Sequence, residues 1–264
     1  MILYHIYIYA YIYTRRDNKN GIKYIKNYNK DFFIIELKTN EKFYIGKKMV
    51  YKDITVIADT FFNNFYNDKN IISGIKDKIV VDVGANIGDT AVFFAKHGGV
   101  VYAYEPSFEL YEAAIKNASL NKLRINFINA GLGSENKKFK LSISKDGATQ
   151  ASKTIFDDNE VFQEETLYLN QYYNYGFEEV QIINFSDILK QFQSVYLVKL
   201  DCEGCEFEIF KCIDSDDLNK VEHFIIEYHF KEPDEIVNLL EENGFNVKIN
   251  KGRIGFIWAD KIQT

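Results

Sequence analysis

From Lys78 onward, short runs of apolar, often β-branched residues alternate with longer stretches that are apolar along one side. Short apolar runs predict buried strands, and apolar positions three or four residues apart predict amphipathic helices. The predicted strands are 79–83, 100–104, 125–129, 139–143, 180–184, 195–200, 221–228, 245–249 and 254–258, and the predicted helices are 89–97, 107–120, 186–192, 206–213 and 233–243. Such alternation is typical of βαβ units. We therefore expect a doubly wound α/β fold with a mostly parallel sheet, closed by a C-terminal antiparallel hairpin.

Residues 1–70 follow a different pattern. Two short apolar runs, 32–37 and 42–47, are joined by Thr39, Asn40 and Glu41, so we expect a hairpin with turn chemistry at its tip. Aromatic residues at helical spacing predict an amphipathic helix over 59–68. The chain is thus expected to divide into a leader with an accessory hairpin and helix, 1–70, and a main domain, 71–264.

The leader itself, 1–13, is uncharged and rich in Ile and Tyr. It is shorter than the ~20 apolar residues that a membrane-spanning helix needs, and it lacks the basic start and small-residue cleavage site of a secretory signal. We therefore expect no stable membrane span and a cytoplasmic protein. The three cysteines agree with a reducing compartment, because an odd number does not make a disulfide framework.

Composition narrows the range of partners. Hydrophobic residues make up 47% of the chain and aromatic residues 16%, which is enough to fill a sizeable core. The formal net charge of −6 argues against a protein that binds by neutralising many phosphates. Nucleic acid is therefore not expected as a partner.

The strongest chemical signal is V-V-D-V-G-A-N-I-G-D-T at 80–90, an apolar strand that runs into a glycine-bearing turn and then a helix. Gly84 and Gly88 would let backbone amides approach a ligand at the positive end of that helix. Glu105 ends the next strand about 20 residues later, where a carboxylate can accept hydrogen bonds from both ribose hydroxyls of a nucleoside.

Two nucleoside cofactors fit that spacing, S-adenosylmethionine (SAM) and a nicotinamide dinucleotide. The turn lacks the G-x-G-x-x-G spacing that seats a pyrophosphate. Asp82 would repel a pyrophosphate, whereas it would attract a sulfonium with its neighbouring ammonium group. SAM is therefore favoured, although Asp82 could instead only cap the turn.

Several ordered motifs resemble the FkbM-type SAM-dependent methyltransferase family over about 61–228. They are the 80–90 motif, Y-A-Y-E-P-S at 102–107, K-N-A-S-L-N at 116–121, V-K-L-D-C-E-G-C-E at 198–206 and I-I-E-Y-H at 225–229. The resemblance implies a class I, Rossmann-like methyltransferase fold with seven strands, and O-methylation of a sugar or small-metabolite hydroxyl. It implies that SAM is bound by Asp82, Gly84, Asn86, Gly88 and Glu105, with Asn129 and Ala130 lining the adenine.

Four further polar residues follow the ends of two successive strands: Asp201, Glu203, Glu227 and His229. Because the carboxyl ends of parallel strands meet at one edge of the sheet, we expect these residues to converge there. His229 or a carboxylate could take the acceptor's proton. Together they could instead hold a divalent cation. Alternatively, Glu203 only shapes a turn and Asp201 orients the methionine part of the cofactor.

Other features are less specific. Cys202 and Cys205 form a C-x-x-C, for which packing is favoured over zinc binding or redox chemistry. Lys199 matches a lysine that the family often has, but alternation along its strand favours a direction away from the site. Tyrosines of a polar insertion could stack on a sugar: Tyr172, Tyr173 and Tyr175. A nicotinamide-dependent oxidoreductase and a non-catalytic nucleoside-binding module remain the alternative functions.

Overall fold

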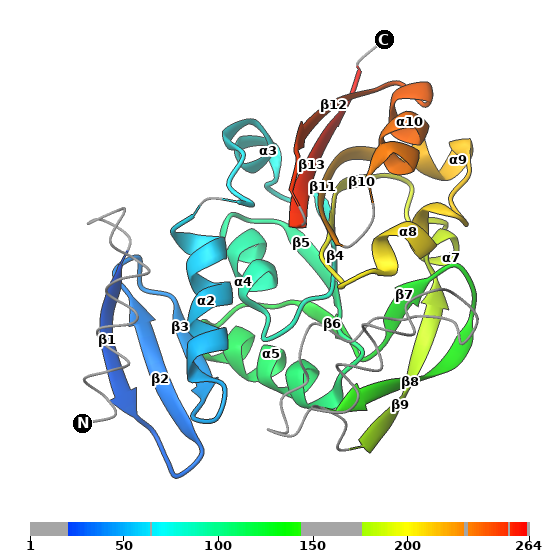
Figure 1. Ribbon diagram of the computed structural model, residues 1–264. Coiled ribbons are helices and arrows are strands. Elements are labelled where there is room, and N and C mark those ends of the chain that lie inside the picture. The colour runs from blue at the N-terminus through cyan, green and yellow to red at the C-terminus, as the bar shows by residue number, and fades with distance from the viewer. Residues whose placement is uncertain (1–20, 64, 144–175, 230–231, 253, 263–264) are drawn as a thin grey trace.

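The computed structural model describes residues 21–63, 65–143, 176–229, 232–252 and 254–262. A seven-stranded sheet forms its centre, in the order β12-β13-β11-β10-β4-β5-β6 (Figure 1). Strands β10 and β11, β10 and β4, β4 and β5, and β5 and β6 pair in parallel, whereas β13 is antiparallel to both of its neighbours. The bounds are β4 (Ile79–Val83), β5 (Val100–Tyr104), β6 (Asn126–Ile128), β10 (Val195–Leu200), β11 (Val221–His229), β12 (Phe245–Asn250) and β13 (Ile254–Lys261). The predicted doubly wound α/β fold is confirmed.

Helices cover both faces of this sheet (Figure 1). One side carries α2 (Val50–Phe61), α3 (Lys69–Gly74), α4 (Asp89–Lys96) and α5 (Phe108–Leu120), and the other carries α7 (Phe185–Leu189), α8 (Cys205–Phe210), α9 (Ser215–Leu218) and α10 (Asp234–Glu242). Every residue of β10 is buried, as a central strand between two helical layers requires. No helix in the described ranges is long and apolar enough to cross a bilayer.

A separate antiparallel sheet packs against the helices at the N-terminal end. Its strands are β1 (Ile22–Asn27), β2 (Phe32–Leu37) and β3 (Lys42–Gly46), and its apolar side shares a core with α2. Two asparagines, Asn117 of α5 and Asn121 at its C-cap, hold the edge of this sheet. Asn117 Oδ1 accepts the Tyr44 N–H at 2.7 Å, and Asn121 Oδ1 accepts the Lys42 N–H at 2.9 Å. The accessory sheet is thus hydrogen-bonded directly to a helix of the central fold.

The structure corrects two expectations in this region. The expected hairpin is present, but β1 adds a third strand from a stretch that looked merely polar. The helix predicted over 59–68 is wrong, because α2 ends at Phe61 and Asp68 caps the separate helix α3 by accepting the Asn70 and Ile71 N–H groups. Aromatic spacing misled the prediction, since Phe62 and Tyr66 are buried without being part of one helix.

A third, small sheet lies beside the end of the central sheet, in the order β7-β9-β8 (Figure 1). Its strands are β7 (Gly131–Gly133), β8 (Lys137–Ile143) and β9 (Gly176–Asn184). The tyrosines of the insertion and the leader 1–13 lie outside the described residues.

Candidate functional site

A cavity of about 280 Å³ opens at the carboxyl ends of β4, β5 and β10. This volume lies near the lower end of the ~300–1,000 Å³ typical of ligand pockets. Six of the predicted site residues line it: Gly84, Asn86, Glu105, Asp201, Glu203 and Glu227. Five others do not: Asp82, Gly88, Asn129, Ala130 and His229. The strand-end argument therefore located the cavity, but only part of its lining.

The turn after β4 is held in left-handed backbone conformations. Gly84, Asn86 and Gly88 have φ values of 76°, 51° and 82°. A Cβ on Gly84 would lie 1.9 Å from the Asp201 carbonyl oxygen, so only glycine lets the two strand ends come this close. Gly88 caps α4, and a Cβ there would lie 2.9 Å from the Ala114 Cβ. Gly88 thus allows the close packing of α4 against α5 and does not itself line the cavity.

Glu105 is held firmly at the cavity wall. Its Oε2 accepts the Asn86 N–H and its Oε1 accepts the Ser107 N–H, both at 2.9 Å. Burial raises the pKa of Glu105 to about 7, while these N–H groups and the cations Lys199 and Lys52 oppose the rise. Each carboxylate oxygen keeps a lone pair for a further donor, so the residue fits the two hydroxyls of a ribose.

Ser107 adds a second polar group to that wall. It is the N-cap residue of α5, but its hydroxyl makes no capping bond. Instead Glu178 Oε1 accepts the Phe108 N–H at 3.0 Å. The buried Ser107 Oγ has no hydrogen-bond partner in the described part of the chain and lines the cavity. A buried hydroxyl without a partner is costly, which supports a polar ligand at this position.

The stretch after β6 contributes differently from the expectation. Asn129 Nδ2 donates to the carbonyl oxygens of Glu105 and Pro106, both at 2.9 Å, so it shapes the turn after β5. Ala130 is buried behind the wall. The next residues, Gly131 and Leu132, line the cavity in their place.

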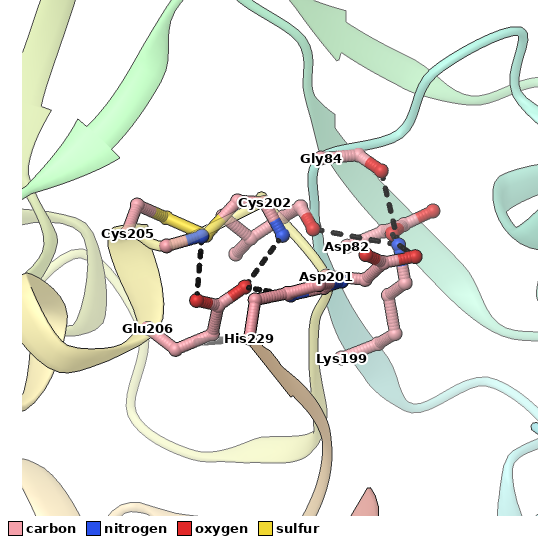
Figure 2. Close-up of a disulfide and its surroundings, with 10 residues drawn as sticks. Asp82, Gly84, Lys199, Asp201, Cys202, Cys205, Glu206 and His229 are labelled. Atoms are coloured by element: carbon pink, nitrogen blue, oxygen red, sulfur yellow. Dashed lines mark hydrogen bonds and ion pairs between the residues drawn. A yellow bond between two sulfur atoms is a disulfide. The ribbon is translucent and has the colours of Figure 1, made fainter. Parts of the chain in front are cut away.

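Asp82 was expected to line the cavity and Lys199 to point away from it, but the structure places Lys199 in the lining and Asp82 behind it. Lys199 Nζ lies 3.2 Å from Asp82 Oδ1 and 3.8 Å from Asp201 Oδ2, and it donates to the Gly84 carbonyl oxygen at 3.0 Å (Figure 2). Thr90 donates to the other oxygen of Asp82 at 2.7 Å. Asp82 is fully buried and does not line the cavity. Lys199, expected to face away, lines the cavity.

The charge of Lys199 persists despite its burial. Burial lowers its pKa, but Asp82, Asp201 and Asp89 raise it more strongly, so the net shift is upward. One ammonium therefore ties together the ends of β4 and β10. A lysine in an otherwise apolar buried strand needs a buried anion, and that signal was available in the sequence.

A tyrosine connects the acidic residues on the far side of the cavity. The Tyr66 hydroxyl lies 3.0 Å from Asp201 Oδ2 and 3.1 Å from Glu227 Oε2, within hydrogen-bond distance of both carboxylates. Burial, followed by the charges of Asp201 and Glu227, raises the pKa of Tyr66 well above its ordinary value. Tyr66 therefore stays a hydrogen-bond donor.

His229 lies behind the acids instead of in the cavity. It is 2% exposed, its Nδ1 lies 3.4 Å from Glu206 Oε1, and its Nε2 lies 3.6 Å from Glu227 Oε1 and 3.7 Å from Glu203 Oε2. Burial lowers the pKa of His229, but Glu206 and Glu227 raise it to about 11. The imidazole is therefore a cation at neutral pH and cannot accept a proton, so the structure argues against His229 as the base.

The turn between β10 and α8 is closed by a disulfide, Cys202–Cys205 (Figure 2). Glu203 and Gly204 have φ values of 59° and 114°, which folds the chain back until the two cysteine Cα atoms lie 5.5 Å apart. The expectation of simple packing for this C-x-x-C was wrong, because it did not foresee the left-handed conformation of Glu203. The disulfide closes a short loop that contains Glu203 and directly follows Asp201.

The Glu206 carboxylate holds this turn in place by accepting two hydrogen bonds from its backbone. Its Oε1 accepts the Cys202 N–H at 3.0 Å and its Oε2 accepts the Gly204 N–H at 2.8 Å. Glu206 is fully buried, and the His229 cation balances its charge. Figure 2 shows Glu206 between the disulfide turn and His229.

Three groups lie close enough to suggest a metal site. Atoms of Asp201, Glu227 and His229 lie within 4.8 Å of one another. Both nitrogens of His229, however, face carboxylates in ion pairs, and a ligand imidazole must be neutral. A cation bound here would therefore have to displace the imidazole proton and replace these ion pairs.

Sequence reasoning missed several cavity residues, including Lys52, Asp59, Thr60, Tyr66, Asp89 and Lys199. Lys52 of α2 is half-buried, and burial lowers its pKa against the opposing effects of Glu203 and Asp53. Most of these residues come from α2 and the segment after it. Which face of α2 meets the central sheet depends on tertiary packing, so its sequence carried no clear signal.

The chain matches a family of methyltransferases and is similar in sequence to a known methyltransferase. Residues 82–247 match the model of the Methyltransferase FkbM domain. Methyltransferase sdnD of Sordaria araneosa is 23% identical over 229 residues, which cover 77% of this chain and 83% of that protein.

Two solved structures have related folds. Magnesium protoporphyrin IX methyltransferase from Synechocystis PCC 6803, with bound SAM, is 14% identical with a TM-score of 0.44, covering 82% of this chain and 83% of that one. Precorrin-6y C5,15-methyltransferase from Geobacter metallireducens GS-15 is 12% identical with a TM-score of 0.43, covering 76% and 90%. Likeness at this level carries no argument about activity.

Proposed function

The chain belongs to the FkbM methyltransferase family and is a SAM-dependent methyltransferase, and from this premise we propose that it methylates a hydroxyl oxygen of a sugar or small metabolite. The family confirms the resemblance noted in the sequence motifs and sets aside the nicotinamide alternative. The observation that carries the proposal is the gathering of Asp201, Glu203 and Glu227 at one end of the cavity, with Glu105 on its wall.

The cavity residues divide into a cofactor part and a reaction part. Glu105 accepts the ribose hydroxyls, and Ser107 and Leu132 line the same part of the cavity. Asp201 is the acid nearest Lys199 that still reaches the cavity, so it takes the cofactor ammonium that Asp82 cannot reach. Lys52 provides a cation for the methionine carboxylate. When bound, the cofactor supplies a methyl group on a sulfonium, which is already activated for transfer.

Glu203 accepts the proton of the acceptor hydroxyl. Burial, with a smaller contribution from Asp201, raises its pKa to about 7 against the lowering effect of His229. A base whose pKa is near the working pH combines availability with driving force. With the cofactor bound, the hydroxyl oxygen would take the methyl group, the cofactor would leave with the C–S electron pair, and the hydroxyl proton would move to the Glu203 carboxylate.

Radiolabelled methyl transfer tests this proposal. Wild-type protein, Glu203→Gln and the exposed control Glu179→Gln are each incubated with labelled SAM and a panel of free sugars and sugar glycosides. We expect a base-stable methyl ether from the wild type and the control. Glu203→Gln should be slower by about 10²–10⁴-fold, with unchanged affinity for adenosylhomocysteine.

The chemistry of the product decides the outcome. Label recovered in a base-labile ester or on nitrogen would contradict a hydroxyl acceptor. No labelled product from any sugar or from a cell extract, despite tight adenosylhomocysteine binding, would favour the non-catalytic alternative. Full activity of Glu203→Gln would remove Glu203 from the role of base.

A further inference from the structure

A second cavity of about 430 Å³ lies between the accessory sheet, the start of α2 and α5. It is larger than the cofactor cavity, and the two share Lys52, Asn86 and Leu110 in their walls. A ligand in the second cavity would therefore reach the edge of the first beside Lys52. None of the functions assigned above uses this space.

A buried carboxylate faces this second cavity. Asp53 is 7% exposed, and its Oδ2 accepts the Gly46 N–H at 2.8 Å. Its Oδ1 has no hydrogen-bond or ion-pair partner among the residues that the structure describes, and Lys52, next to it in sequence, makes no direct ion pair with it there. Burial raises the pKa of Asp53 to about 7, against the lowering effects of the Gly46 N–H and of Lys52, so the ionised carboxylate would gain from a further donor at Oδ1. A ligand hydroxyl would satisfy it.

Aromatic rings form the opposite part of the lining. Tyr28 and Tyr44 meet edge to face with ring centroids 5.0 Å apart, and Phe32 also lines the cavity. Tyr28 is 55% exposed, so its ring is accessible to a ligand. Rings pack against the apolar C–H face of a sugar, and carboxylates accept its hydroxyls.

The charges narrow the ligand class further. Three carboxylates, those of Asp53, Glu109 and Glu112, line the cavity against the two ammonium groups of Lys52 and Lys116. Lys116 is already paired with Glu112 at 3.3 Å. Such a lining is unfavourable to a phosphate, because like charges repel. It is also unfavourable to a plain lipid chain, because the chain would desolvate a carboxylate without offering a hydrogen bond.

We propose that this second cavity binds the carbohydrate part of the methyl acceptor, with Asp53 accepting its hydroxyls and Tyr28 stacking on its ring. The inference rests on the proposed function, and it assigns the accessory sheet the task of choosing the acceptor. The reacting hydroxyl then passes Lys52 and Asn86 to reach Glu203 in the first cavity.

Saturation-transfer NMR on the full chain with excess adenosylhomocysteine tests this assignment. The probes are methyl β-D-glucopyranoside, methyl α-L-fucopyranoside and methyl α-L-rhamnopyranoside, with 1-octanol as the apolar comparison. We expect ring-proton signals from at least one glycoside. Asp53→Asn should raise that glycoside's Kd at least ~10-fold, and Tyr28→Ala should raise it by about 3- to 10-fold. The exposed control Asp216→Asn should leave it unchanged.

Two variants keep the test sound if one of them folds poorly. The asparagine side chain can still accept the Gly46 N–H, and Tyr28 is largely at the surface, so thermal melting should stay near wild type in both. Signals from 1-octanol alone, no signal from any glycoside, or an unchanged glycoside Kd in both folded variants would overturn the proposal. Calorimetry with adenosylhomocysteine on the same samples separates the two failures, because loss of that binding contradicts the proposed function instead.

Discussion

The ionisation of Glu105 makes cofactor affinity depend on pH. Burial raises the pKa of this carboxyl to about 7, while the Ser107 and Asn86 N–H groups and the cations Lys199 and Lys52 lower it. Ribose hydroxyls that donate to the carboxylate bind its ionised form, so binding to protonated Glu105 must first release a proton. Affinity therefore rises with pH until Glu105 is ionised and then levels off.

The size of the effect follows from that pKa of about 7. About three quarters of Glu105 is ionised at about pH 7.5 and about 3% at about pH 5.5, so the Kd of adenosylhomocysteine should rise by up to ~25-fold between them. Glu105→Gln removes the charge and turns an amide N–H toward one of the two backbone N–H groups. We expect a Kd at least ~10-fold above wild type near neutral pH, with no pH slope.

Isothermal titration calorimetry over this pH range measures both effects. Glu179→Gln is the matched control, because Glu179 is exposed and Lys138 lowers its pKa, so it stays ionised throughout. A flat wild-type profile would refute the reasoning. A slope that persists in Glu105→Gln would assign the pH dependence to Asp89, Glu203 or Asp53 instead, since burial also raises their pKa values to about 7.

Two further predictions concern stability. Lys199→Met leaves Asp82 as a buried, unpaired charge and should lower the free energy of unfolding by about 3–5 kcal/mol, or the Tm by roughly 6–20 °C in calorimetry. Adding Asp82→Asn to this variant should recover part of the lost stability. No recovery would contradict the pairing of Lys199 with Asp82. Reduction of Cys202–Cys205, which have a sequence separation of 3, should cost about 2 kcal/mol through chain entropy, or roughly 4–8 °C in Tm. Cys202→Ser with Cys205→Ser should show no response to dithiothreitol, and a wild type equally indifferent to it would show that the bond contributes nothing.

Apolar patterning was sufficient for the central sheet. Strand β10 runs over Val195–Leu200 as predicted, and β4 and β5 also keep their predicted bounds. Short, continuous apolar runs bounded by polar or glycine residues favour buried strands of this length. The meeting of Glu105 with Gly84 at one cavity followed in turn, since parallel strands bring their carboxyl ends to one edge.

Side-chain partners could not be read in the same way. Lys199 and Asp82 are direct register partners in adjacent parallel strands, so their side chains lie on the same face. That register joins segments more than a hundred positions apart, and local periodicity contains no information about it. The left-handed backbone of Glu203 is equally hidden, because glutamate gives no local preference for positive φ.

Asn117 connects the accessory sheet to the turn after β4 through two hydrogen bonds. This one fully buried amide accepts the Tyr44 N–H at 2.7 Å and donates to the Ile87 carbonyl oxygen at 2.8 Å. Both bonds cannot be kept at these lengths if the sheet shifts relative to the turn that follows Asn86. Asn117, together with the bond between Lys42 and Asn121, therefore connects the position of β3 to that of the turn after β4, so a displacement of the accessory sheet would strain the turn that carries Gly84 and Asn86.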